Sequence, residues 1–229
     1  MKKFSLLFII VFMLISIASK AYALDMSVGI TSWYSWWDYD RGGEKPDIGP
    51  SLLYGPAISV KLNDDFNLTF VYLYGAFEHT HSDGTVDKYK RSDSNLALNY
   101  IVNNYFTVFA NLNYMALGVK KYIQQSTYGP ELGIKAVYPI SENLSLLATL
   151  SGFYLWGKES YDNNDPSINF KDYGINSTLS LAYYISSAST TISLGGRFQY
   201  FKADYSNDSE SINQKFYGVT LTAMYAFSL

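Results

Sequence analysis

The sequence predicts an all-β protein: a transmembrane, antiparallel, up-and-down β-barrel of about ten strands that follows a cleaved signal peptide. Apolar residues alternate with small or polar ones along about ten stretches, which is the two-residue period of a strand. The connections between these stretches are alternately short and long. The chain also holds 22 Tyr and 14 Phe, without a second apolar run long enough for a transmembrane helix. An eight-stranded barrel, with the fourth and fifth stretches misread, is the alternative.

The first 23 residues have the features of a secretory signal peptide. Lys2 and Lys3 precede an apolar run from Phe4 to Ile17, and the small-residue site Ala21-Tyr22-Ala23 follows. The run is shorter than the roughly 20 residues that a membrane-spanning helix needs. We therefore expect cleavage before Leu24 and a single barrel domain over residues 24–229.

Composition excludes several classes of protein. There is no cysteine, so the chain has neither a disulfide framework nor a lipidated cysteine. The whole chain has a formal charge of −3, and the signal peptide removes only lysines from it. The mature chain is thus more acidic still, which argues against a nucleic-acid partner.

The predicted strands are joined by turns of two kinds. They cover approximately 26–37, 52–62, 66–77, 89–102, 105–118, 128–140, 144–157, 171–185, 190–202 and 215–229. Short polar turns lie at 63–65, 103–104, 141–143 and 186–189, and long polar loops lie at 38–51, 78–88, 119–127, 158–170 and 203–214. Short turns at one end and long loops at the other are typical of outer-membrane barrels, with the short turns in the periplasm.

Charge separates the two faces of these strands. On the face with the apolar residues, charges occur only next to the long loops, at Lys90, Lys171 and Lys202. A charge at mid-bilayer on a lipid-facing position costs about 2–4 kcal/mol for Arg or Lys, so this face is predicted to meet lipid. The opposite face carries charges of both signs and is predicted to line a polar lumen.

A Tyr-Gly pair recurs at the start of several strands, at Tyr54-Gly55, Tyr128-Gly129, Tyr173-Gly174 and Tyr217-Gly218. Related pairs, Tyr74-Gly75 and Trp156-Gly157, end two others. The aromatic residue is always on the lipid face, which predicts an aromatic girdle of Tyr54, Tyr74, Tyr128, Trp156, Tyr173 and Tyr217 at one membrane interface. Pro56 and Pro130 follow two of these glycines, and we expect a bulge or a bend there.

With these features the chain resembles the small bacterial outer-membrane β-barrel proteins, over the whole mature chain and in architecture rather than in a specific motif. The resemblance implies a monomer in the outer membrane of a Gram-negative bacterium, with long loops extracellular and both termini periplasmic. It also implies contact with outer-membrane lipid and lipopolysaccharide. In that family the last strand, here Phe216 to Leu229, is recognised by the barrel-assembly machinery. Leu229 stands where those proteins usually have an aromatic residue.

The charged lumen residues support two hypotheses. Arg91, Arg197 and Lys135 could pair with Asp93, Glu131 and Asp172 as a polar plug, because unpaired buried charges cost several kcal/mol each. The same six residues could instead line a narrow pathway whose selectivity follows their charge. We expect the plug, because an interior of about ten strands is only slightly wider than one that side chains fill.

Candidate catalytic residues are few. His79 and His81, with Asp83, lie in the second long loop, where two histidines at alternate positions could ligate a metal or act as a base. Outer-membrane proteases, which also have ten strands, use an Asp–His pair and a second acidic pair, and Asp38 with Asp40 could be offered as the latter. A solvated polar loop explains these residues better, so the sequence predicts no metal and no cofactor, and an enzyme is not expected.

The sequence therefore predicts an outer-membrane barrel with a structural or surface-interaction role and a mostly occluded polar lumen. Its loops are candidates for binding extracellular ligands. A narrow porin-like channel for small polar solutes is the main alternative, and an outer-membrane hydrolase with a loop His/Asp site is the second.

Overall fold

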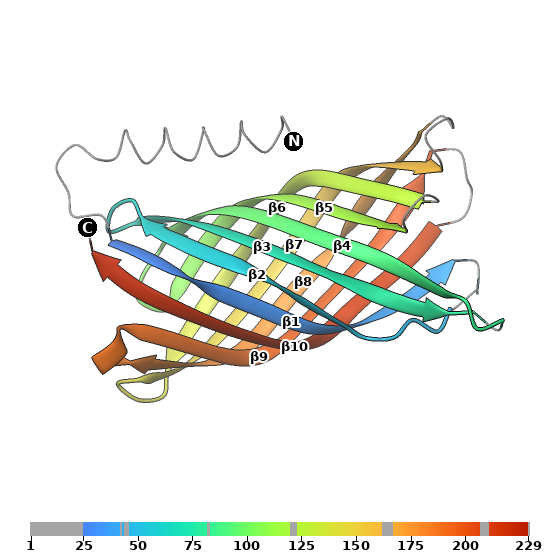
Figure 1. Cartoon of the computed structure of the whole chain (residues 1–229). Helices are drawn as coiled ribbons and strands as arrows, with labels where there is room; N and C mark the ends of the chain where they lie inside the picture. Colours follow the sequence, from blue (N-terminus) through green and yellow to red (C-terminus); the bar gives the residue numbers. More distant parts are fainter. Residues whose placement is uncertain are drawn as a thin grey trace.

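A computed structural model describes residues 25–41, 43, 46–81, 83–119, 123–161, 167–206 and 211–228. Within these ranges ten antiparallel strands form one closed barrel, in which each strand pairs with its neighbours in sequence and β10 closes against β1 (Figure 1). The predicted ten-stranded barrel is thus confirmed and the eight-stranded alternative is wrong. The predicted signal peptide and Leu229 lie outside the described residues.

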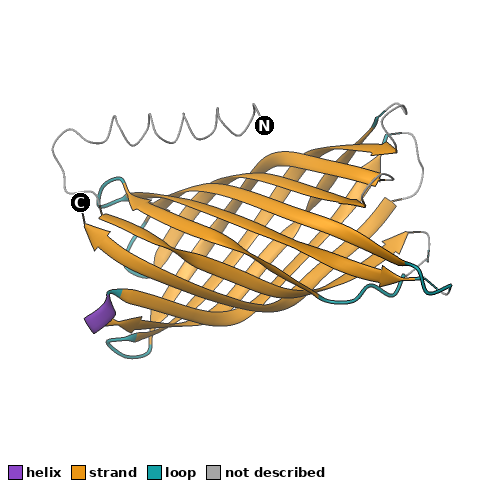
Figure 2. Cartoon of the chain, viewed as in Figure 1, coloured by secondary structure: helices purple, strands orange, loops and turns teal. Residues whose placement is uncertain are grey.

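The strands are 11 to 18 residues long. They are β1 (Asp25–Arg41), β2 (Ser51–Lys61), β3 (Phe66–Thr80), β4 (Val86–Ile101), β5 (Phe106–Val119), β6 (Ile123–Pro139), β7 (Leu144–Tyr161), β8 (Ile168–Ile185), β9 (Thr190–Tyr205) and β10 (Ser211–Ser228). A single 3-10 turn, Ser186–Ala188, connects β8 to β9 (Figure 2). In the part of the chain that is described, no helix is long and apolar enough to cross a membrane.

Most strands extend further toward the long loops than the alternation predicts. β1 continues to Arg41 and pairs there with Ile212, whereas the prediction ended β1 at Trp37 and began the last strand at Lys215. Above the apolar band the outward positions become polar, so hydropathy no longer marks the strand although the backbone pairing continues. Since about 9–11 residues suffice to cross a bilayer, strands such as the 18-residue β7 project beyond it.

The two prolines interrupt pairing without adding a residue. Tyr54 pairs with Tyr74 and Ala57 with Val71, so the register of β2 against β3 is the same on both sides of Pro56. The same holds around Pro130, between β6 and β7. The expectation of a bulge is therefore wrong. Proline removes a ladder donor, and here the sheet loses pairing locally and keeps its register.

Side chains alternate between a lumen face and an outer face along each strand. In β1, Trp33 is fully buried and Trp37 is 4% exposed, whereas Ile30 is 70% exposed. The short turns, the start of β1 and the end of β10 lie at one end of the barrel, and the connections predicted as long loops lie at the other, although β6 begins at Ile123, only four residues after β5 ends at Val119 (Figure 1). We refer to these as the short-turn end and the long-loop end.

Candidate functional site

The lumen is closed near the long-loop end by a cluster of apolar side chains, which we call the lumen plug. Its buried members are Trp33, Trp37, Ile48, Leu53, Leu73, Phe77, Met115, Leu117, Phe153, Leu155, Phe201 and Phe216. These residues come from every side of the barrel wall, because they belong to β1, β2, β3, β5, β7, β9 and β10 and to the first loop. At this level the lumen is therefore filled chiefly by apolar groups rather than by the predicted ion pairs.

Phe216 on β10 lies at the centre of the plug. Its ring stacks on Trp37 with centroids 5.3 Å apart and on Phe201 at 5.7 Å, and it also meets Phe77 of β3 at 5.7 Å. Phe201 in turn contacts Phe153 of β7 at 6.1 Å. Aromatic rings at these separations attract one another beyond the effect of burial alone. The chain of rings from β3 to β7 thus crosses the lumen.

Arg91 anchors the plug to the polar side chains beneath it. Its guanidinium is fully buried, with Cζ 3.9 Å from the centroid of the Phe216 ring. Nε and Nη2 donate to the two carboxylate oxygens of Asp93 at 2.8–3.2 Å, and Nη2 also donates to Gln199 at 2.7 Å. A cation between an aromatic face and a carboxylate is stabilised by both. Arg91 and Asp93 are therefore paired, as the plug hypothesis expects.

Arg197 and Glu131 form a second polar cluster. Arg197 lies 4.3 Å from the centroid of the Trp33 ring and donates through Nε to Asn176 at 3.1 Å. Glu131 accepts hydrogen bonds from Asn111 at 2.9 Å and from Asn113 at 2.7 Å, and also from Ser151 and Asn176. The buried carboxylate is thus held mainly by amides, so neutral donors replace the expected cation.

Lys135 and Asp172 do not join the Arg91–Asp93 pair. Lys135 donates to Asn99 at 2.5 Å and lies 5.0 Å from the centroid of the Phe109 ring. Asp172, on β8, is 1% exposed, and its Oδ1 accepts no hydrogen bond from the described residues. The six charged residues therefore make one ion pair and several separate contacts. Residue type predicted their inward direction, but their depth along the barrel depends on the register of β4, β6, β8 and β9.

Below the plug the lumen opens toward the short-turn end. A polar vestibule of about 530 Å³ lies there, lined by Asp25, Ser27, Ser59, Lys61, Asn67, Tyr184 and Ser228 among others. Lys61 forms an exposed ion pair with Asp64 at 2.8 Å, and this pairing raises the pKa of Lys61 and lowers that of Asp64. The lumen is thus hollow at the short-turn end, whereas packed apolar side chains fill it near the long-loop end.

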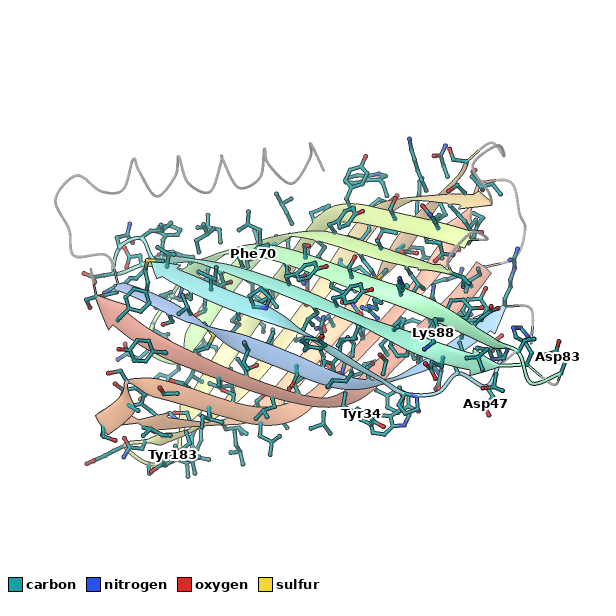
Figure 3. All side chains as sticks on the ribbon, viewed as in Figure 1. Tyr34, Asp47, Phe70, Asp83, Lys88 and Tyr183 are labelled. Carbon is teal, nitrogen blue, oxygen red and sulfur yellow. The ribbon has the colours of Figure 1, made fainter. Side chains whose placement is uncertain are left out.

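The histidines belong to the β3–β4 hairpin, whose tip projects from the long-loop end near Asp83 (Figure 3). His79 donates through Nδ1 to the carbonyl of Asp47 at 2.7 Å, and His81 contacts Asp87 through Nε2 at 2.9 Å. Asp83 accepts from both the hydroxyl and the amide of Thr85, and these bonds lower its pKa. Each of these three side chains therefore has a partner, which is in the first loop for His79 and within the hairpin for His81 and Asp83.

Among the described residues no group of three or more His, Cys, Asp and Glu side chains could hold a metal ion. Asp87, the partner of His81, carries no sequence signal for this contact, because the ladder pairs Asp87 with His79 and not with His81. Asp38 and Asp40 instead line a cavity of about 340 Å³ with Pro46, Tyr200, Asn213 and Lys215.

The predicted girdle residues all lie on the outer face. Their exposed fractions range from 39% for Tyr173 and Tyr217 to 61% for Tyr54. Trp36, which the sequence analysis did not name, stacks on Tyr217 with centroids 5.9 Å apart. At the other end Tyr100, Tyr138, Tyr183 and Tyr225 are also exposed on the outer face. Two bands of aromatic side chains therefore border the apolar wall.

No protein-family model and no curated protein matches this chain. Among solved structures, the outer membrane protease OmpT of Escherichia coli is similar, with a TM-score of 0.52 and 10% identity over 92% of this chain and all of that one. Two others are Ail, the attachment invasion locus protein of Yersinia pestis, and the toluene transporter TodX of Pseudomonas putida. Ail has a TM-score of 0.41 and 15% identity, over 88% of this chain and 98% of its own. TodX has a TM-score of 0.40 and 8% identity, over 93% of this chain and 92% of its own. At such identities likeness shows the fold and no activity. The chain has the fold of the small bacterial outer-membrane β-barrel proteins.

Proposed function

We propose that the protein is an outer-membrane barrel that does not conduct solutes and has a structural or surface-interaction role. In this proposal the long-loop end is extracellular and both chain ends are periplasmic. The single observation that supports it best is the lumen plug, whose rings meet across the barrel. A conducting path would have to separate them.

The cost of opening such a path supports a sealed lumen. An aromatic side chain buries about 150–250 Å² of surface, and burial of apolar surface contributes about 25 cal/mol per Å². Exposing one ring to water therefore costs about 4–6 kcal/mol. The plug contains Trp33, Trp37, Phe77, Phe201 and Phe216 with exposed fractions of 0–4%, so a pathway through it would require several such losses at once.

The long-loop end is built as an ordered surface, which supports a role in surface interaction. The end of the first loop folds back onto β3: Gly49 donates its amide to the carbonyl of Glu78 at 2.8 Å, and Ile48 forms a β-bridge with His79. Ile48 is buried against the plug. A loop fixed in this way presents its polar side chains with little loss of conformational entropy on binding.

Single-channel recording in planar bilayers tests the sealed lumen. We expect a closed baseline for the wild-type protein and ion conduction for the double variant Trp37→Ala/Phe216→Ala, which removes two stacked rings of the plug. The control is Trp36→Ala/Tyr217→Ala, which removes two stacked rings from the same strands on the outer face and should stay closed. Steady wild-type conduction that changes when Arg197 and Lys135 become Ala would establish the narrow pore instead.

A further inference from the structure

Arg197, on β9, is a half-buried lumen cation that has no ion pair with the described residues. The other lumen arginine, Arg91, is paired with Asp93 at 2.8 Å. Glu131 is linked to Arg197 only through Asn176, which accepts from Nε at 3.1 Å and donates to the carboxylate at 3.4 Å. A charge that is removed from bulk water and has no direct counter-charge is costly. The lumen therefore holds a guanidinium whose charge is not directly neutralised.

A small cavity lies beside this guanidinium, between the lumen plug and the polar side chains beneath it. Its volume is about 20 Å³. Its polar lining includes Arg91, Asp93, Asn95, Asn113, Arg197 and Gln199, and Met115, Phe153, Leu155 and Phe201 of the plug also line it. A cavity of this size holds one particle about as large as a water molecule. It is therefore large enough for a single monatomic ion and too small for a polyatomic ion such as sulfate.

Several donors on the lining of this cavity lack an acceptor. Gln199 uses Oε1 to accept from Arg91 at 2.7 Å, so its amide nitrogen remains as a donor. Asn95 likewise uses Oδ1 to accept from Asn111 at 3.3 Å. Neither amide nitrogen donates to a described residue, and the same holds for Nη1 of Arg91 and for both Nη atoms of Arg197. The lining therefore offers more hydrogen-bond donors than the protein itself satisfies.

The acceptors on the same lining are already in use. Both carboxylate oxygens of Asp93 accept from Arg91, and Oδ1 of Asn113 accepts from Asn111 at 3.0 Å. A water molecule in the cavity would bring two hydrogens of its own, and the lining offers them only acceptors that are engaged. An anion accepts hydrogen bonds and donates none, so it matches a lining of this kind and gains further from charged donors.

We propose that this cavity binds one monatomic anion, chloride, as a structural ligand of the lumen. The guanidinium of Arg197 and the amide nitrogens of Gln199 and Asn95 hold the ion. The bound charge neutralises Arg197, which no carboxylate of the described residues contacts directly. Three observations support the site together: an unpaired guanidinium, a cavity of the right size, and a surplus of donors on its lining.

The first test measures how stability depends on chloride. Purified full-length mature protein in a zwitterionic detergent is unfolded with urea in sodium chloride or in sodium gluconate of the same ionic strength. A ligand that binds only the folded barrel lowers the unfolding equilibrium constant about tenfold when about nine in ten molecules hold it. We expect wild-type protein in chloride to show a decrease of about this size relative to gluconate.

Two variants that introduce the same charge separate a specific site from a general salt effect. Gln199→Glu places a second carboxylate oxygen where the donor amide lines the cavity, so its own negative charge should exclude chloride and abolish the response. Gln124→Glu is the matched control, because Gln124 is exposed on the outer face, and it should keep the response. A heat-dependent gel shift shows that each variant remains a folded barrel.

Anomalous X-ray scattering from bromide locates the ion directly and requires no variant. Crystals of the wild-type protein soaked in sodium bromide should show an anomalous peak in the cavity beside Arg197. Equal stability of the wild type in chloride and gluconate overturns the proposal. A cavity with water and no bromide peak also overturns it, as does a full response in Gln199→Glu or its loss in Gln124→Glu. Since these measurements involve neither conduction nor adhesion, their result is independent of the tests of the proposed function.

Discussion

At the scale of single residues, the most consequential side chain is Arg91, because it joins the apolar plug to the polar lumen. Its charge is balanced by Asp93 and its flat face packs against Phe216. Both partners are buried, so neither can recover its interaction by turning toward water. Removal of one partner of such a pair leaves an uncompensated charge, and this penalty exceeds the net contribution of the pair itself.

We therefore expect Arg91→Met to lower the free energy of unfolding by about 3–5 kcal/mol. Arg91→Met/Asp93→Asn should recover a large part of that loss, because the stranded carboxylate is gone. The measurement is urea unfolding in detergent or lipid vesicles, followed by tryptophan fluorescence. If the double variant is no more stable than the single one, Arg91 does not compensate the charge of Asp93, and the proposed role of this ion pair in stability is wrong.

At the scale of elements, close contact between strands explains the glycines that follow the girdle aromatics. A Cβ atom on Gly174 would lie 1.9 Å from the carbonyl oxygen of Tyr200 on β9, and one on Gly55 would lie 2.2 Å from that of Tyr72 on β3. These lumen-facing positions have no room for a side chain because the neighbouring backbone occupies it. The Tyr-Gly repeat is thus a packing requirement as well as a marker of the girdle.

Gly174→Ala should destabilise the barrel by about 1–3 kcal/mol, because β8 and β9 must separate to admit the methyl group. Gly152→Ala is the matched control on β7. Its Cβ would come no closer than 3.8 Å to another strand, so it should be neutral or stabilise the protein by about 0.4–1 kcal/mol. Urea midpoints measured under identical conditions decide between these outcomes, and equal midpoints for the two variants would contradict the packing explanation.

At the scale of the whole molecule, the two ends of the barrel differ in construction. The short-turn end encloses an open polar vestibule, whereas the long-loop end holds the lumen plug, extends beyond the girdle and carries the docked end of the first loop. The β3–β4 hairpin projects from this end (Figure 3). If the protein interacts with other surfaces, this hairpin is the element best placed to do so.

Replacement of residues 81–85 by Asn-Gly tests that role. Thr80 and Val86 are paired, and Asn-Gly favours the two-residue turn that such a pair requires, so the barrel should still fold. We expect whole-cell adhesion to immobilised glycans and matrix proteins to fall at least several-fold. Replacement of Asn63-Asp64-Asp65 by a different short polar turn is the control and should leave adhesion unchanged. Equal adhesion of the hairpin variant and the wild type would remove this hairpin from the proposed role.

The sequence by itself determined the barrel, a count of about ten strands and the inward direction of the six charged lumen residues, because alternation and turn composition are local properties of the chain. Only the tertiary structure decided which side chains contact one another inside the lumen. Trp37, Phe77 and Phe216 are far apart in sequence, and they meet because register and closure bring β1, β3 and β10 to one depth. The same geometry left Asp172 apart from Arg91. A two-residue period specifies a face but not a depth, and contacts across a lumen depend on depth.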